Sequence, residues 1–254
     1  MSEAQKTAVI FGLANKRSIA WAIAQKLQQS GWRLAITYQN ERLALEAKDL
    51  ISELPGAAGF MCDVTKDDEL DRLFAELRQQ YGVLHGVVHS IGFAPEADLK
   101  GEFVNVSRDG FRMTNDISVY SLIAVSRGAL PLMTSGGSII TLTYYGAEKV
   151  VPRYDLMGVA KAALEASMRY LAHNLGPKNI RVNAISAGPI KTLASRGISG
   201  FGEMLKVQAE RAPLKRNVET AEVAATAEFL LSDAGSGITG ETIYVDCGYN
   251  IMGF

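Results

Sequence analysis

The residues best suited to chemistry lie between positions 139 and 163, in the stretch IITLTYYGAEKVVPRYDLMGVAKAA. Two tyrosines, Tyr144 and Tyr154, precede Lys161 there. The apolar start predicts a buried strand, and the small residues around the lysine predict a helix, with a loop between them. A strand end and a helix start can bring a phenol and an ammonium group to one place. Such a pair can donate a proton or stabilise an oxyanion, which makes it a candidate catalytic pair.

Strands and helices alternate along the whole chain and together would position this pair. Short apolar runs predict seven strands, at residues 6–11, 34–38, 58–62, 84–89, 138–143, 180–185 and 242–245. Helical spacing predicts helices at residues 18–31, 41–54, 63–81, 107–133, 155–175 and 220–231, with residues 63–65 capping the third. The alternation predicts an α/β fold, a single doubly wound Rossmann-type domain over residues 1–254 with a seven-stranded parallel sheet. Ligands of such sheets bind beyond the carboxyl ends of the strands, so the other site residues are expected there.

The bulk composition is that of a globular protein. The chain has 254 residues, of which 48% are hydrophobic and 21% charged, and its net charge is −1, which gives no basic field for nucleic acid or anionic membranes. The longest apolar stretch, near residues 117–125, is too short and interrupted for a membrane span, and the first residues carry no apolar signal segment. Cys62, Cys247 and the three histidines show no metal-type spacing, so we expect free thiols in a reducing cytoplasm and no metal site.

The positions after the first two predicted strands carry residues suited to a dinucleotide. Gly12 can form the tight turn after the first strand, and Ser18 can cap the following helix and bind a phosphate. Gln39, after the second strand, can hydrogen-bond an adenosine ribose, but it does not repel a 2′-phosphate as a carboxylate would. Arg42 nearby keeps NADP open as an alternative to NAD.

The next two strand ends continue this pattern. Asp63 can accept from the exocyclic amine of adenine while Val64 packs on the ring, although Asp63 could equally cap the next helix. The residues Ser90, Ile91 and Gly92 place a small side chain where a backbone must approach a ligand closely. Each feature alone is ordinary, but four consecutive strand ends with ligand-suited residues predict a dinucleotide cofactor.

The spacing of the candidate catalytic pair resembles a branch of the short-chain dehydrogenase/reductase superfamily. That superfamily usually has Tyr four residues before Lys, but Met157 stands there, and Tyr144 occupies the usual serine position. Tyr154 instead precedes Lys161 by seven residues. This Tyr-x6-Lys pattern resembles the divergent branch, the enoyl-[acyl-carrier-protein] reductases of bacterial type II fatty-acid synthesis. Matching stretches extend along the chain: TYQN at 37, HSIGFAP at 89, NDIS at 115, MGVAKA at 157 and RVNAISAGPIKTLA at 181.

The resemblance implies NADH-dependent reduction of trans-2-enoyl thioesters carried on acyl carrier protein, the last step of fatty-acid elongation, by a cytoplasmic homotetramer. Tyr154 would donate to the thioester oxygen, Lys161 would hold the nicotinamide ribose, and Tyr144 would border the thioester. The implied cofactor-binding residues are Gly12, Ser18, Ile19, Gln39, Asp63, Val64, Ser90, Ile91, Gly92, Lys161, Ile190, Thr192 and Ala194. The implied substrate-binding residues are Ala94, Tyr144, Tyr154, Met157, Ala194, Ile198 and Phe201, with a substrate-binding loop and helices over residues 190–215.

An acyl carrier protein is acidic, so the resemblance also predicts a basic surface near that loop. Its candidates are Lys191, Arg196, Lys206, Arg211, Lys215 and Arg216. Ordinary solvated charges would be the alternative interpretation of these residues. No nucleic acid or membrane is expected as a partner.

Two departures and two alternative functions stay open. Arg153 and Asp155 flank Tyr154 where the family usually has asparagines, and the sequence does not settle their effect, the acyl-chain preference or strict use of NADH. A carbonyl (3-oxoacyl) reductase of the same superfamily would need a tyrosine at position 157 and a serine at position 144. A non-catalytic dinucleotide-sensing protein would bind the cofactor without turnover, which the intact Tyr–Lys pair argues against.

Overall fold

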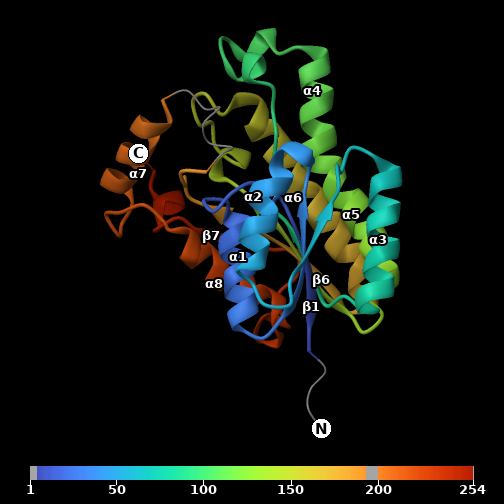
Figure 1. The fold of residues 1–254 in the computed structure, drawn as a ribbon. Helices are drawn as coiled ribbons and strands as arrows, with labels where there is room; N and C mark the ends of the chain where they lie inside the picture. Colours follow the sequence, from blue (N-terminus) through green and yellow to red (C-terminus); the bar gives the residue numbers. More distant parts are fainter. Residues whose placement is uncertain (1–4, 193–199, 254) are drawn as a thin grey trace.

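The computed structural model describes residues 5–192 and 200–253, which form one parallel sheet covered by helices on both faces (Figure 1). The strands lie in the order β3-β2-β1-β4-β5-β6-β7, and every neighbouring pair is parallel. Their bounds are β1 Thr7–Phe11, β2 Arg33–Tyr38, β3 Ala58–Met61, β4 Gly86–His89, β5 Gly137–Thr143, β6 Ile180–Ala187 and β7 Thr242–Val245. The predicted seven-stranded doubly wound fold is confirmed.

The helices are α1 Ile19–Gln29, α2 Glu41–Ser52, α3 Asp67–Tyr81, α4 Arg108–Asn115, α5 Ser121–Ala129, α6 Asp155–Leu175, α7 Phe201–Arg211 and α8 Thr220–Leu231. Alternate residues of a strand point to opposite faces of a sheet. In β1, Ala8 and Ile10 therefore pack with α1, α2 and α8, whereas Val9 and Phe11 pack with α3, α5 and α6. Because both faces are covered, the strands are apolar without alternation.

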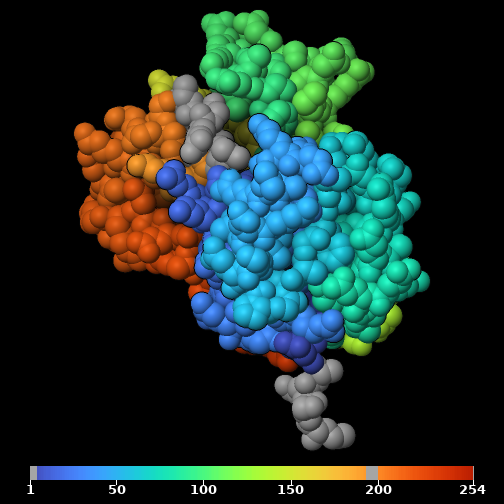
Figure 2. Space-filling view, in the orientation of Figure 1, coloured from blue at the N-terminus to red at the C-terminus, as the bar shows by residue number. Residues whose placement is uncertain are grey.

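The predicted helix over residues 107–133 is interrupted. A π-helical turn at Asp116–Tyr120 separates α4 from α5, and a 3₁₀ turn at Leu130–Leu132 follows α5. Within the π-helical turn, the Ser118 hydroxyl donates to the carbonyl of Phe93 and accepts from its N–H, both at 3.0 Å. The turn therefore holds the loop that follows β4. Helix α4 stands beyond the sheet, at the top of Figures 1 and 2.

The predicted cap of α3 is also wrong. The helix begins at Asp67 with Lys66 as its N-cap residue. Asp63 instead accepts from the backbone and the hydroxyl of Thr65, at 3.1 and 2.8 Å, which closes a local turn. Within the described part of the chain, no helix combines the length and the apolarity that a membrane span needs.

Candidate active site

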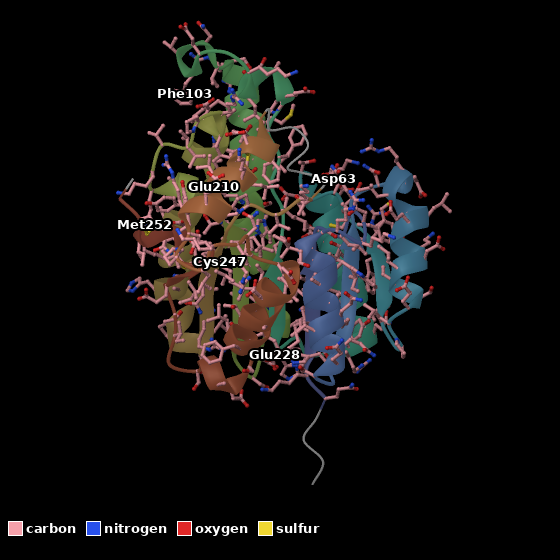
Figure 3. All side chains as sticks on the ribbon, turned by 90° about the vertical axis from the view of Figure 1, so that its left-hand side faces the viewer. Asp63, Phe103, Glu210, Glu228, Cys247 and Met252 are labelled. Carbon is pink, nitrogen blue, oxygen red and sulfur yellow. The ribbon has the colours of Figure 1, made fainter. Side chains whose placement is uncertain are left out.

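The carboxyl ends of the central strands bring the predicted site residues to one edge of the sheet. Phe11 at the end of β1 pairs with His89 at the end of β4, and His89 pairs with Thr141 of β5. The segments after these strands are therefore neighbours. In Figure 3, Asp63 lies toward this edge, whereas Glu228 of α8 lies toward the opposite end of the sheet.

Gly12 brings the first and fourth strand ends into close approach. Its φ angle is +98°, and a Cβ atom built on it would lie 2.0 Å from the backbone oxygen of Ser90. A side chain at this position would meet rigid backbone, so only glycine fits. The prediction that residue 12 needs glycine thus has a specific physical cause.

The N-terminus of α1 lacks a side-chain cap. Ser18 occupies the N-cap position, but its hydroxyl donates to the Asn15 carbonyl at 2.5 Å and accepts nothing from the first turn. The predicted capping by Ser18 is therefore wrong. Helix α1 leaves its positive N-terminal end uncompensated, and this end suits the pyrophosphate of a dinucleotide.

The two candidate phenols are in direct contact. Tyr154 directly precedes α6, and its ring meets that of Tyr144 edge-on, with centroids 4.9 Å apart and planes at 76°. Tyr154 is only 8% exposed, and the hydroxyl of Tyr144 lies 3.6 Å from the sulfur of Met204 on α7. Burial raises the pKa of both phenols, so both are neutral hydrogen-bond donors near pH 7.

Lys161 is a buried ammonium group on α6, the helix that follows Tyr154. Its Nζ donates to the Leu142 carbonyl at 2.8 Å, and the residue is 7% exposed. Burial lowers the pKa of Lys161 to about 8, opposed by the negative charge of Glu165. A Cβ atom on Gly92 would lie 3.4 Å from this Nζ and 3.5 Å from the methyl carbon of Met157, so the loop after β4 reaches the same place.

Comparison with known proteins identifies the family of the chain. A family model described as "Enoyl-(Acyl carrier protein) reductase" matches residues 12–250. The chain belongs to the enoyl-(acyl carrier protein) reductase family. It is 52% identical over 250 residues to the enoyl-[acyl-carrier-protein] reductase [NADH] of Bacillus cereus, covering 98% of each chain. It is also 51% identical to an NADPH-named enoyl-[acyl-carrier-protein] reductase of Staphylococcus aureus, covering 97% of each chain.

Solved structures of this reductase family agree with the fold. The Bacillus cereus enoyl-acyl carrier protein reductase with NADP⁺ and an indole naphthyridinone superposes with a TM-score of 0.97 at 52% identity, covering all of both chains. The enzyme from Anaplasma phagocytophilum in complex with NAD gives a TM-score of 0.95 at 47% identity, covering 98% and 95% of the two chains. The predicted family membership is confirmed.

The remaining predicted residues of this family member are spread along the same edge. Gln39 is exposed after β2, while Asp63 and Val64 are half-buried after β3. Ile19, the first residue of α1, and Ile190, which follows β6, pack against the apolar core on the face of the sheet that α1 and α8 cover. Ser90, Ile91 and Thr192 are half-buried.

The predicted substrate residues divide between the described part of the chain and the remainder. Ala94 packs with Tyr144, Tyr154 and Met157 in a small apolar cluster, which could face an acyl chain. Phe201 begins α7. Ala194, Arg196 and Ile198 lie outside the described residues. Among the residues that are described, no three His, Cys, Asp or Glu side chains gather as they would to hold a metal ion.

A buried acid in this site was missed from sequence. Glu165, four residues after Lys161 and therefore on the same face of α6, is 6% exposed and accepts from the Thr143 hydroxyl at 2.7 Å. The four-residue separation from Lys161 was the available signal. The apolar surroundings that make the acid unusual come only from the packed structure.

A buried histidine was also missed. Nε2 of His89 lies 2.8 Å from the Ser121 hydroxyl, which itself donates to the Ile117 carbonyl. Nε2 must therefore carry the proton, and Nδ1 accepts from the Thr141 hydroxyl at 2.9 Å. Burial, helped by the charge of Lys161, lowers the pKa of His89 to about 3, so this ring is a neutral structural link between β4, β5 and α5.

Proposed function

We propose that this protein reduces the trans-2 double bond of enoyl thioesters on acyl carrier protein, with NADH as the hydride donor. The observation that carries the proposal is the edge-on contact of Tyr154 with Tyr144 at the start of α6, the helix whose buried Lys161 bonds to the end of β5, in a chain of the enoyl-(acyl carrier protein) reductase family. When bound, the reduced nicotinamide supplies the hydride that the β-carbon accepts. Negative charge then develops on the thioester oxygen, and the resulting enolate takes a proton from solvent at its α-carbon to complete the reduction.

Tyr154 stabilises that charge by donating a hydrogen bond to the thioester oxygen. Its raised pKa keeps the phenol protonated across the working pH range. Its contact with Tyr144 restricts the ring, so the hydroxyl is held in place before substrate arrives. Tyr144 borders the thioester, and Ala94, Met157, Ala194, Ile198 and Phe201 border the acyl chain.

Lys161 holds the nicotinamide ribose and keeps the local field positive. Gly12, Ser18 and Ile19 take the pyrophosphate at the N-terminus of α1, while Ser90 to Gly92 approach the cofactor from the end of β4. The other proposed contacts are Gln39, Asp63, Val64, Ile190, Thr192 and Ala194. Gln39 is followed by a single nearby cation, Arg42, and not by a run of basic residues that could bind a 2′-phosphate, so NADH is the proposed cofactor.

Basic side chains near α7 support docking of the acidic acyl carrier protein. Lys191, Lys206, Arg211 and Lys215 are exposed. Arg216 differs, because its guanidinium contacts both carboxylate oxygens of Glu222, at 2.8 and 2.7 Å. We expect Lys206→Glu to raise KM for enoyl-acyl carrier protein several-fold but not KM for a short crotonyl thioester, whereas Arg216→Gln has a smaller effect.

A homotetramer working in the cytoplasm completes the proposal. Helices α4 to α6 and the turn between them expose large apolar side chains that a monomer would leave in water: Phe111, Tyr120, Ile123, Val159 and Tyr170. Sedimentation analysis at micromolar concentration tests the assembly, and a monomer would contradict it.

The function is tested by following reduced-nicotinamide oxidation with crotonyl and acetoacetyl thioesters, each with NADH and with NADPH. Turnover of the crotonyl thioester with NADH is expected. Turnover of the keto substrate alone would instead identify a carbonyl reductase. Tyr154→Phe should lower kcat by about 10²-fold while leaving NADH affinity unchanged, because it removes only the donor to the thioester oxygen. Cofactor binding without any turnover would identify a dinucleotide sensor.

A further inference from the structure

Two adjacent hydrogen bonds attach α6 to β5 directly beneath the site. Lys161 Nζ donates to the Leu142 carbonyl at 2.8 Å, and the Thr143 hydroxyl donates to Glu165 at 2.7 Å. Leu142 and Thr143 are consecutive on the strand, while Lys161 and Glu165 lie one helical turn apart. The second bond therefore fixes the helix at the level of the first. Tyr144 directly follows this attachment.

The acid that makes the second bond lies in an environment that disfavours charge. Glu165 is 6% exposed and Thr143 is 4% exposed. Burial raises the pKa of Glu165, and the hydrogen bond from Thr143 opposes that rise. A buried carboxylate is costly unless it is paired or hydrogen-bonded, so a purely mechanical attachment would be made more cheaply by apolar side chains.

The charges around Glu165 and Lys161 come from four elements. The charges of Arg169 and Lys161 on α6 lower the pKa of Glu165, and the charge of Glu148 after β5 raises it. The charge of Glu165 in turn raises the pKa of Tyr154 and of Tyr244 on β7. The Tyr244 hydroxyl donates to Glu148, which ties down that second acid at the exposed side. Facing Lys161, His89 is neutral, and Glu165 is the anion that favours the ammonium form.

We propose that Glu165 is a positioning residue that keeps Lys161 both in place and protonated, through its bond to Thr143 and its charge one turn away. The inference rests on the proposed function of the site, since it assigns Lys161 the task of holding the cofactor. Its two components can be separated by mutation. Glu165→Gln keeps the size and the acceptor oxygen for Thr143 but removes the charge, whereas Thr143→Val removes the bond and leaves the carboxyl group itself in place.

The test compares wild type, Glu165→Gln and Thr143→Val over a pH series. NADH affinity is measured by fluorescence titration, and kcat/KM is measured with a crotonyl thioester. In wild type both should fall as Lys161 loses its proton above neutral pH. In Glu165→Gln this alkaline fall should move down by about one pH unit, because the ammonium loses its anionic partner. In Thr143→Val the fall should move less than in Glu165→Gln, because the carboxyl group remains, while kcat/KM drops several-fold at every pH.

An alkaline fall at the same pH in wild type and Glu165→Gln would overturn the proposal, as would an equal displacement in Thr143→Val. Glu165→Asp is the second variant, should the glutamine variant not fold. It keeps the charge, so its alkaline fall should match wild type, and a full-unit displacement would count against the proposal. The NADH titration needs no turnover, so it still tests Glu165 if the crotonyl thioester proves not to be the substrate.

Discussion

Replacing Gly12 by alanine tests whether the close approach of two strand ends is required. A Cβ atom there would lie 2.0 Å from the Ser90 oxygen, at a φ of +98°. Gly31, between α1 and β2, is the matched control. Its φ is +81°, but a Cβ atom there would meet nothing within 4 Å. The two variants share the backbone strain, and only Gly12→Ala adds the steric clash.

The magnitudes follow from these two contributions. A left-handed conformation costs an L-residue roughly 1–2 kcal/mol, and the stiffer unfolded chain returns about 0.4–1 kcal/mol. Gly31→Ala should therefore lose about 1 kcal/mol of unfolding free energy. Gly12→Ala must also separate the ends of β1 and β4, and such overpacking adds about 1–3 kcal/mol. Its total loss is then about 2–4 kcal/mol, or a fall in Tm of roughly 5–15 °C for a chain of this length.

Urea unfolding of wild type and both variants measures this difference, and NADH titration measures its consequence at the site. Gly12→Ala should weaken NADH binding by at least about 10-fold, since the turn and Ser90 both move, while Gly31→Ala should bind as wild type does. Equal stabilities for the two alanine variants would refute the reasoning, because the clash with Ser90 would then have no energetic effect.

Two other predictions concern the residues around the phenols. Lys161→Met should abolish activity yet stabilise the protein at pH 7 by about 2 kcal/mol. The gain arises because burial lowers the pKa of the lysine from 10.5 to about 8, and losing its hydrogen bond offsets part of that gain. Between those pH values the unfolded chain binds more protons than the folded one, so the stability of the wild type rises with pH and the stability advantage of Lys161→Met should shrink. Thermal unfolding of both proteins at pH 7 and pH 10 measures this change. A stability difference that stays constant with pH would contradict the prediction. Arg153 has a φ angle of +69°, which asparagine tolerates better than arginine, so Arg153→Asn should gain about 0.5–1 kcal/mol in urea unfolding. A loss in Arg153→Asn would show that the guanidinium, which lies against Gly200, contributes more than the strain removes.

Much of the fold was predictable because it depends on local periodicity. Helices α6 and α8 and strand β7 begin and end where the pattern of apolar residues predicted. The break at Asp116–Tyr120 was not predictable, because Ser118 bonds to Phe93, which lies 25 residues earlier in the chain. The cap of α3 failed for a different, local reason. Asp63 and Thr65 satisfy each other in a turn, and the helix starts only beyond it.

The sequence by itself determined the chemistry: the Tyr-x6-Lys spacing, the glycine at position 12 and the family that these motifs indicate. Only the tertiary structure decided how the groups meet. It set the ring of Tyr154 edge-on against Tyr144, buried Lys161 on the Leu142 carbonyl and bonded Glu165 to Thr143 one helical turn away. The reason is physical. Spacing along a helix places side chains on one face, but the pKa of a buried group depends on desolvation and charges supplied by segments remote in the chain.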